Sequence, residues 1–234
     1  MPEYSPEVRA SLDRYGFEDP YDPRFLRLCV FGEAMRNSAV RWPHVDFSEL
    51  AAVNPDVCGW IHMDGCPLSY PVVNAREDPR YYLRHNFSGE ESFHGAVVLS
   101  RECAGAMGGR NTVLTAHTMR DWTMFRSVRA LCDQTYLDSH PTVWLLSSDG
   151  ARWRGRWFAA ARFNRWQPWP TRVRFGDDAE FAAWLARVLD GNWLRTGVEP
   201  DSQSHVLTCV TCAMTPGEYS MRAVFAVLEP HDAS

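Results

Sequence analysis

Helical spacing of apolar residues near the start of the chain gives way, after Asn54-Pro55, to short β-prone runs. Asp22-Pro23 opens the clearest N-terminal helix and Trp42-Pro43 ends it, because proline suits a first helical turn but does not continue a helix. Residues 1–45 are therefore predicted to form a peripheral helical region. Residues 46–230 are predicted to form the main domain, since 234 residues suffice for one sizeable core.

The main domain consists of short apolar runs bounded by glycine, proline and polar turns, a pattern typical of β-strands. Two helices interrupt the runs, one over Met124–Cys132 and a stronger one over Asp178–Leu189, whose apolar face includes Leu189. This pattern predicts a mainly β protein with peripheral helices, built as a closed or nearly closed antiparallel barrel. The predicted strands are Cys58–His62, Leu68–Val73, Gly95–Leu99, Asn111–Ala116, Thr142–Leu146, Trp153–Phe163, His205–Thr211 and Met221–Leu228.

Composition narrows the range of functions. All 24 basic residues are arginine, which excludes Schiff-base, P-loop and general-base lysines. The net charge of -5 argues against nucleic acid as the main partner. Seven scattered cysteines lack the spacing of a disulfide framework, so reduced thiols are expected. No run approaches the roughly 20 apolar residues that span a bilayer, and we expect no transmembrane segment in this chain.

The strand that ends at Cys212 carries the strongest candidate chemistry. Pro216-Gly217 predicts a turn after it, and the next apolar strand carries Arg222, so two antiparallel neighbours would bring Cys212 and Arg222 together. A cysteine is nucleophilic as the thiolate and needs a base or a positive charge nearby. The alternative is an ordinary buried cysteine at a strand end.

His117 is the candidate base because it ends a β-prone run and precedes polar residues. A surface or core histidine without a catalytic role is the alternative. Arg222 lies beside an apolar run, where a guanidinium needs an ion-pair partner or a developing oxyanion. We hypothesise that Cys212 is the nucleophile, His117 the proton carrier and Arg222 the oxyanion stabiliser.

Two other patterns allow different functions. Cys209 and Cys212 form Cys-x-x-Cys, which suggests a thiol oxidoreductase or zinc site. Residues three apart in a strand point to opposite faces, and no second ligand pair has zinc spacing, so Cys209 is predicted to be core and no metal or cofactor is expected. The alternating arginines and tryptophans of residues 152–157 suggest either a nucleic-acid surface or a strand with its arginines in water, and we favour the strand.

Taken in order, several segments resemble the class B sortases, which are cysteine transpeptidases of Gram-positive cell surfaces. The resemblance extends from about Asp46 to Leu228. The chain departs from the family pattern at Ala116 and Thr118 beside the histidine. It also departs at Cys209, Val210 and Ala213 around the cysteine. The segments that carry the resemblance are Asn54–Ile61, Tyr70–Val73, Tyr81–Gly95, Thr115–Phe125, Thr208–Cys212 and Arg222.

The resemblance implies a sortase β-barrel of about eight strands, with N-terminal helices and one helix before the cysteine strand. It implies that Cys212 attacks the carbonyl after the threonine of a C-terminal sorting signal. Arg222 would hold the oxyanion and His117 would protonate the leaving amine.

The same resemblance implies the partners and the location. The acyl group would pass from a surface protein with a sorting signal to an amine of peptidoglycan or a pilin, at the extracytoplasmic face of a membrane. Any membrane anchor would lie outside this chain. We expect Thr211, Ser220 and Asn86 near the substrate. The remaining alternatives are a thiol oxidoreductase that uses Cys209 and Cys212, and a sortase-like binding module without turnover.

Overall fold

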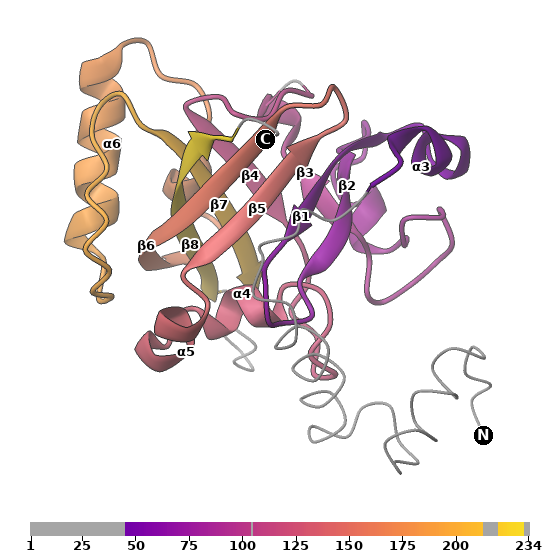
Figure 1. Cartoon of the computed structure of the whole chain (residues 1–234), viewed down its shortest axis with the longest axis horizontal. Coiled ribbons are helices and arrows are strands. Elements are labelled where there is room, and N and C mark those ends of the chain that lie inside the picture. Colours follow the sequence, from indigo (N-terminus) through magenta and orange to yellow (C-terminus); the bar gives the residue numbers. More distant parts are fainter. Residues whose placement is uncertain (1–44, 104, 213–219, 232–234) are drawn as a thin grey trace.

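A computed structural model describes residues 45–103, 105–212 and 220–231 (Figure 1). Nearly all of the predicted helical region over residues 1–45 lies outside this part of the chain, as does the predicted turn at Pro216-Gly217. No helix in the described part combines the length and apolar character needed to cross a membrane.

Eight strands close into a barrel, which confirms the predicted architecture. The strands are β1 Val57–His62, β2 Ser69–Asn74, β3 Val97–Leu99, β4 Asn111–Thr115, β5 Thr142–Ser147, β6 Arg152–Asn164, β7 His205–Cys212 and β8 Ser220–Pro230. Around the barrel they follow the order β1-β2-β3-β4-β7-β8-β6-β5 (Figure 1). The expectation of a wholly antiparallel barrel is wrong, because β2 pairs with β3, and β4 with β7, in parallel.

The β4–β7 pair is parallel because β5, β6 and a long helix lie between the two strands in sequence, so the chain returns to the same end of the barrel before β7 begins. Such a crossover is the usual way to join parallel strands, whereas hairpins join antiparallel ones. The periodicity of apolar residues predicts each strand, but it does not predict whether two paired strands run parallel or antiparallel.

In the described part of the chain, four short or medium helices lie outside the barrel. They are α3 Phe47–Val53, α4 Arg126–Ala130, α5 Gln134–Ser139 and α6 Asp178–Asp190, with single 3-10 turns η1 Tyr81–Leu83, η2 Arg101–Cys103 and η3 Trp169–Thr171. The side chain of Asp177 caps α6 by accepting from the Glu180 amide. Leu189 is 42% exposed, so its predicted place on the buried face is wrong. It follows Val188 by one position, about 100° around the helix, and lies off the buried stripe.

Helix α6 covers the outside of the barrel near β6 and β8 (Figure 1). Trp184 of α6 packs against Phe225 of β8, with 6.0 Å between the ring centroids. Residues 206–211 of β7 and 223–228 of β8 are all buried. Cys212 is therefore the last residue of a strand whose preceding six residues are buried, which fixes its backbone.

Candidate active site

The parallel pairing of β4 and β7 brings two of the predicted site residues together. Thr115 lies opposite Val210 in the register, and the amide of Ala116 donates to the Val210 carbonyl at 3.3 Å. Because parallel strands end at the same edge of a sheet, His117, two residues past β4, and Cys212, the last residue of β7, meet at one edge of the barrel.

Contact with His117 makes the Cys212 thiol more acidic. A hydrogen bond from His117 lowers the pKa of Cys212 below its usual value despite partial burial, and the charges of His117 and Arg165 add to this effect. The pKa of His117 is raised, first by its hydrogen bond with Cys212 and then by the Leu83 carbonyl, against the effect of burial. The two shifts favour a thiolate paired with an imidazolium.

The Leu83 carbonyl also fixes the orientation of the imidazole. His117 Nε2 lies 2.8 Å from the Leu83 oxygen. A carbonyl oxygen only accepts hydrogen bonds, so Nε2 carries a proton and Nδ1 is the nitrogen that takes up or releases one. Sequence reasoning did not identify Leu83, because it acts through its backbone and no side-chain pattern indicates this role.

Two threonine hydroxyls support the backbone beside this pair. Thr211 Oγ1 donates to the Ala116 carbonyl at 2.8 Å and lies 2.6 Å from Thr118 Oγ1. Thr118 Oγ1 is also 3.4 Å from the Cys212 carbonyl. Thr211 is completely buried, so its side chain links the histidine and cysteine segments inside the barrel wall.

Arg222 lies on the strand that pairs with the Cys212 strand, as predicted. In the β7–β8 register Arg222 is opposite Thr211, and Met221 is opposite Cys212. Arg222 Nη1 donates to the Met221 carbonyl at 3.2 Å. Its positive charge opposes the rise that burial causes in the pKa of Cys132. The backbone position agrees with the prediction, while the described contacts do not place the guanidinium on the Cys212 sulfur.

Arg165 contributes positive charge at Cys212, and sequence reasoning missed this role. It follows the last residue of β6 directly, and nothing in its sequence context separates it from the other arginines. Ser220 begins β8, is half-buried and lies opposite Asn164 of β6.

Asn86 closes the loop that follows Leu83. Its Nδ2 donates to Glu90 Oε2 at 2.9 Å, and its Oδ1 accepts from the Glu90 amide at 3.0 Å. Asn86 thus braces the segment whose Leu83 carbonyl holds the His117 ring.

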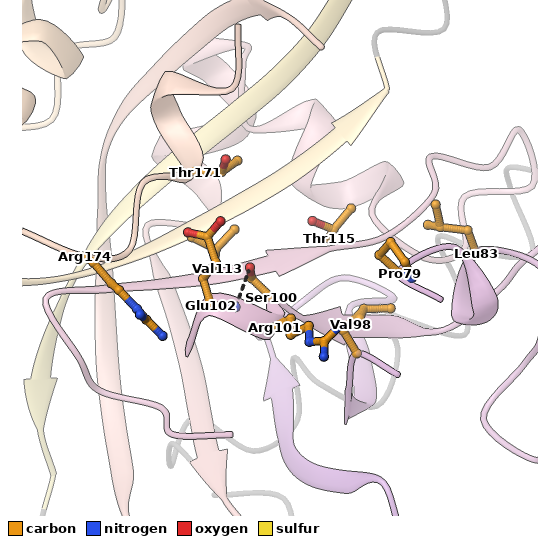
Figure 2. A pocket seen from close by; sticks show the side chains of 11 residues that line it. Pro79, Leu83, Val98, Ser100, Arg101, Glu102, Val113, Thr115, Thr171 and Arg174 are labelled. Atoms are coloured by element: carbon orange, nitrogen blue, oxygen red, sulfur yellow. Dashed lines mark hydrogen bonds between the residues drawn. The ribbon is translucent and has the colours of Figure 1, made fainter. Parts of the chain in front are cut away.

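A groove of about 730 Å³ lies along β4 (Figure 2). Val113 and Thr115, which lie on one face of β4, line it, and Leu83 and Pro79 line one end. That end is close to the catalytic candidates, because the Leu83 carbonyl contacts His117. A strand floor with loop walls suits an extended peptide.

Cys209 does not act together with Cys212. Both thiols are free, Cys209 is completely buried, and burial raises the pKa of its thiol. This geometry argues against the dithiol alternative. Within the described residues, no cluster of three or more histidine, cysteine or acidic side chains is arranged to hold a metal ion.

Curated relatives share part of this sequence. Sortase B of Listeria monocytogenes is 23% identical over 167 residues, which cover 71% of this chain and 67% of the relative. Sortase B of Staphylococcus aureus is 23% identical over 178 residues, covering 76% and 72%. The chain resembles the class B sortases. No family model matches it.

Solved sortase B structures share the fold. The Clostridium perfringens enzyme aligns with a TM-score of 0.71 at 24% identity, covering 79% of this chain and all of that one. Bacillus anthracis sortase B in complex with AAEK1 aligns with a TM-score of 0.70 at 24% identity, covering 79% and 84%. The predicted resemblance and sortase-type barrel are confirmed, and the relatives support a sortase-type cysteine transpeptidase.

The lowered pKa of Cys212 predicts thiol reactivity that depends on His117. A lowered pKa keeps the thiolate present at lower pH, so Cys212 should react with iodoacetamide at a pH where an ordinary thiol is largely protonated. His117→Ala is expected to move this pH profile upward and to slow alkylation several-fold at neutral pH. Peptide-level mass spectrometry follows Cys212 alone. His94→Ala removes a histidine that pairs with Asp121 and should leave the profile unchanged; equal profiles for wild type and His117→Ala would refute the pairing.

The threonine pair predicts a position-dependent effect within β7. Thr211→Val leaves the Ala116 carbonyl without its donor and should lower the free energy of unfolding by about 1–3 kcal/mol. It should also slow alkylation of Cys212. Thr208→Val removes a similar buried bond, to Asn111 Oδ1 at 2.6 Å, four residues before Cys212, and should cost similar stability without slowing alkylation. Urea unfolding and alkylation rates test both; equal slowing by the two variants would contradict a local role for Thr211.

Proposed function

We propose that this chain is a class B-like sortase that cleaves a C-terminal sorting signal after threonine and transfers the acyl group to an amine. The observation that carries the proposal is the His117–Cys212 pair, with its lowered thiol pKa, next to Leu83, which lines a peptide-sized groove. Acyl transfer needs a nucleophile, a proton carrier and a donor for the oxyanion, and the two strand ends with Arg222 supply these groups.

In the first half-reaction, the Cys212 thiolate attacks the backbone carbonyl carbon of the threonine. The electron pair of the C=O π bond moves to the carbonyl oxygen. Arg222 leaves the Met221 carbonyl and donates to this oxyanion. His117 then gives its Nδ1 proton to the departing amine as the C–N bond breaks. A thioester on Cys212 and a neutral imidazole remain.

In the second half-reaction, an acceptor amine enters the place that the leaving group vacated. His117 Nδ1 takes a proton from this amine as its nitrogen attacks the thioester carbon. Collapse of the oxyanion forms the new amide and releases the Cys212 thiolate. The Leu83 carbonyl holds Nε2–H throughout, so one ring nitrogen handles the proton in both directions.

The proposed partners follow from this chemistry and from the relatives. One structural neighbour is a sortase B–substrate complex from Staphylococcus aureus, with a TM-score of 0.72 at 19% identity, covering 96% of this chain and all of that one. We propose that a surface protein with a sorting signal is the acyl donor here. The proposed acceptor is an amine of peptidoglycan or a pilin, and the proposed site of action is the extracytoplasmic face of the membrane.

Intact-protein mass spectrometry tests the reaction. The protein is incubated with peptide pools that contain one fixed threonine followed and preceded by mixed residues, with and without short amines. We expect an acyl adduct on wild type and on Cys209→Ala, no adduct on Cys212→Ala, and release of the adduct by an amine. A folded protein with a reactive Cys212 but no adduct would contradict the transpeptidase and favour a binding module. Loss of activity in Cys209→Ala would favour the oxidoreductase.

The proposed role of Arg222 predicts a separation of two reactions at the same sulfur. Arg222→Ala should slow acylation by peptide about 10²–10³-fold, the usual effect of removing an oxyanion donor. Alkylation of Cys212 by iodoacetamide forms no oxyanion and should change little. Arg165→Gln should instead slow alkylation, because the Arg165 charge favours the thiolate. Equal slowing of both reactions by Arg222→Ala would contradict an oxyanion role.

A further inference from the structure

The two ends of the groove along β4 differ in charge. Leu83 and Pro79 line one end (Figure 2), and the Leu83 carbonyl contacts His117. Arg174 lines the opposite end, and Arg101 and Glu102 lie between (Figure 2). All three charged residues are exposed, so they meet whatever enters the groove.

Within residues 45–103, 105–212 and 220–231, the two groove arginines differ from nearby arginines in forming no salt bridge. Arg110 pairs with Asp178, and Arg172 pairs with Glu180. Among the described residues, neither Arg101 nor Arg174 forms a salt bridge. Two guanidiniums and the single carboxylate of Glu102 leave one excess positive charge in the groove, on a chain whose net charge is -5.

The charged end lies a defined number of peptide residues from the reacting atoms. Val113 lines the groove near Arg174, and four residues of extended chain separate it from His117, which corresponds to about 13 Å. An extended substrate that runs along β4 has the same rise per residue as the strand. Its residue beside Arg174 is therefore about four residues before the threonine whose carbonyl is attacked.

The groove suits the N-terminal side of the signal. In the proposed reaction the N-terminal part stays attached to Cys212 while the leaving amine departs and an acceptor takes its place. The walled groove fits the part that remains, whereas the C-terminal side must be vacated between the two half-reactions.

We propose that Arg101 and Arg174 select sorting signals that carry an acidic side chain about four residues before the cleaved threonine. This inference rests on the proposed function. Planar guanidiniums bind carboxylates through paired hydrogen bonds, and neither guanidinium is held in a salt bridge by a residue of the described part of the chain. Because the site is exposed, the expected preference is moderate, about three- to tenfold in rate, and should shrink as salt rises.

Peptide pools test the preference. Each pool has a fixed threonine, with Asp, Asn or Lys at one position from two to six residues before it and equal mixtures elsewhere. Asp should exceed Asn about three- to tenfold in Cys212 acylation near position four, and Lys should be lowest. Asn matches Asp in shape without its charge. Binding of labelled pools to Cys212→Ala, measured by fluorescence anisotropy, reports the same preference without chemistry.

Variants assign the preference to individual residues. Arg174→Gln and Arg101→Gln should each reduce the Asp/Asn ratio, and the double variant should bring it to about one. Glu102→Gln removes a repulsive charge and should raise the ratio. Arg154→Gln makes the same charge change at an exposed position of β6 that does not line the groove and should leave the ratio unchanged.

The outcomes separate the two proposals. An unchanged ratio in the double variant, or a preference for Lys, overturns the acidic selection. Equal acylation by all pools overturns the selection but supports the transpeptidase. If no pool acylates Cys212 while Asp pools bind Cys212→Ala more tightly, the proposed reaction fails and the acidic selection stands.

Discussion

The parallel ladder between β4 and β7 is the constraint on which the candidate site depends. It aligns Thr115 with Val210, so the segments that follow both strands meet at one edge of the barrel. Helix α6 supports this ladder indirectly, because Trp184 packs on Phe225 and β8 pairs along the full length of β7. Two residues 95 positions apart in sequence thereby lie within hydrogen-bonding reach without a flexible loop placing either. A hairpin would have sent the second strand to the other end of the barrel.

Within this frame, the partner of each thiol decides its chemistry more than its burial does. Burial raises the pKa of Cys58 to about 12 and of Cys132 to about 11. Cys212 is also partly buried, yet its hydrogen bond with His117 outweighs the cost of desolvation and lowers its pKa. Cys58 and Cys132 therefore serve as controls for Cys212, which differs from them in its hydrogen bond with an imidazole that the Leu83 carbonyl orients.

Sequence alone predicted much of this. Alternation and turn residues gave all eight strands to within a few residues, and the resemblance gave the closed barrel. The pattern of apolar residues could not give the strand directions, because this pattern is the same in parallel and antiparallel pairs. It could not give the Leu83 carbonyl, since a backbone group has no residue signature. Thr118 departs from the family pattern, and the sequence did not indicate that its hydroxyl forms a hydrogen bond with Thr211. Helix α5 was missed because six residues make fewer than two turns, which is too few to show a repeating apolar face.

The most direct test of the central claim is an NMR titration of the His117 ring in wild type and in Cys212→Ala, with both proteins labelled at histidine nitrogen. If the thiolate and the imidazolium form a pair, the raised pKa of His117 depends on Cys212. The account predicts that the midpoint falls to lower pH when the sulfur is removed. It also predicts that Nε2 stays protonated on both sides of the midpoint, held by the Leu83 carbonyl. An unchanged midpoint, or loss of the proton from Nε2, would contradict the pairing and the proton route built on it.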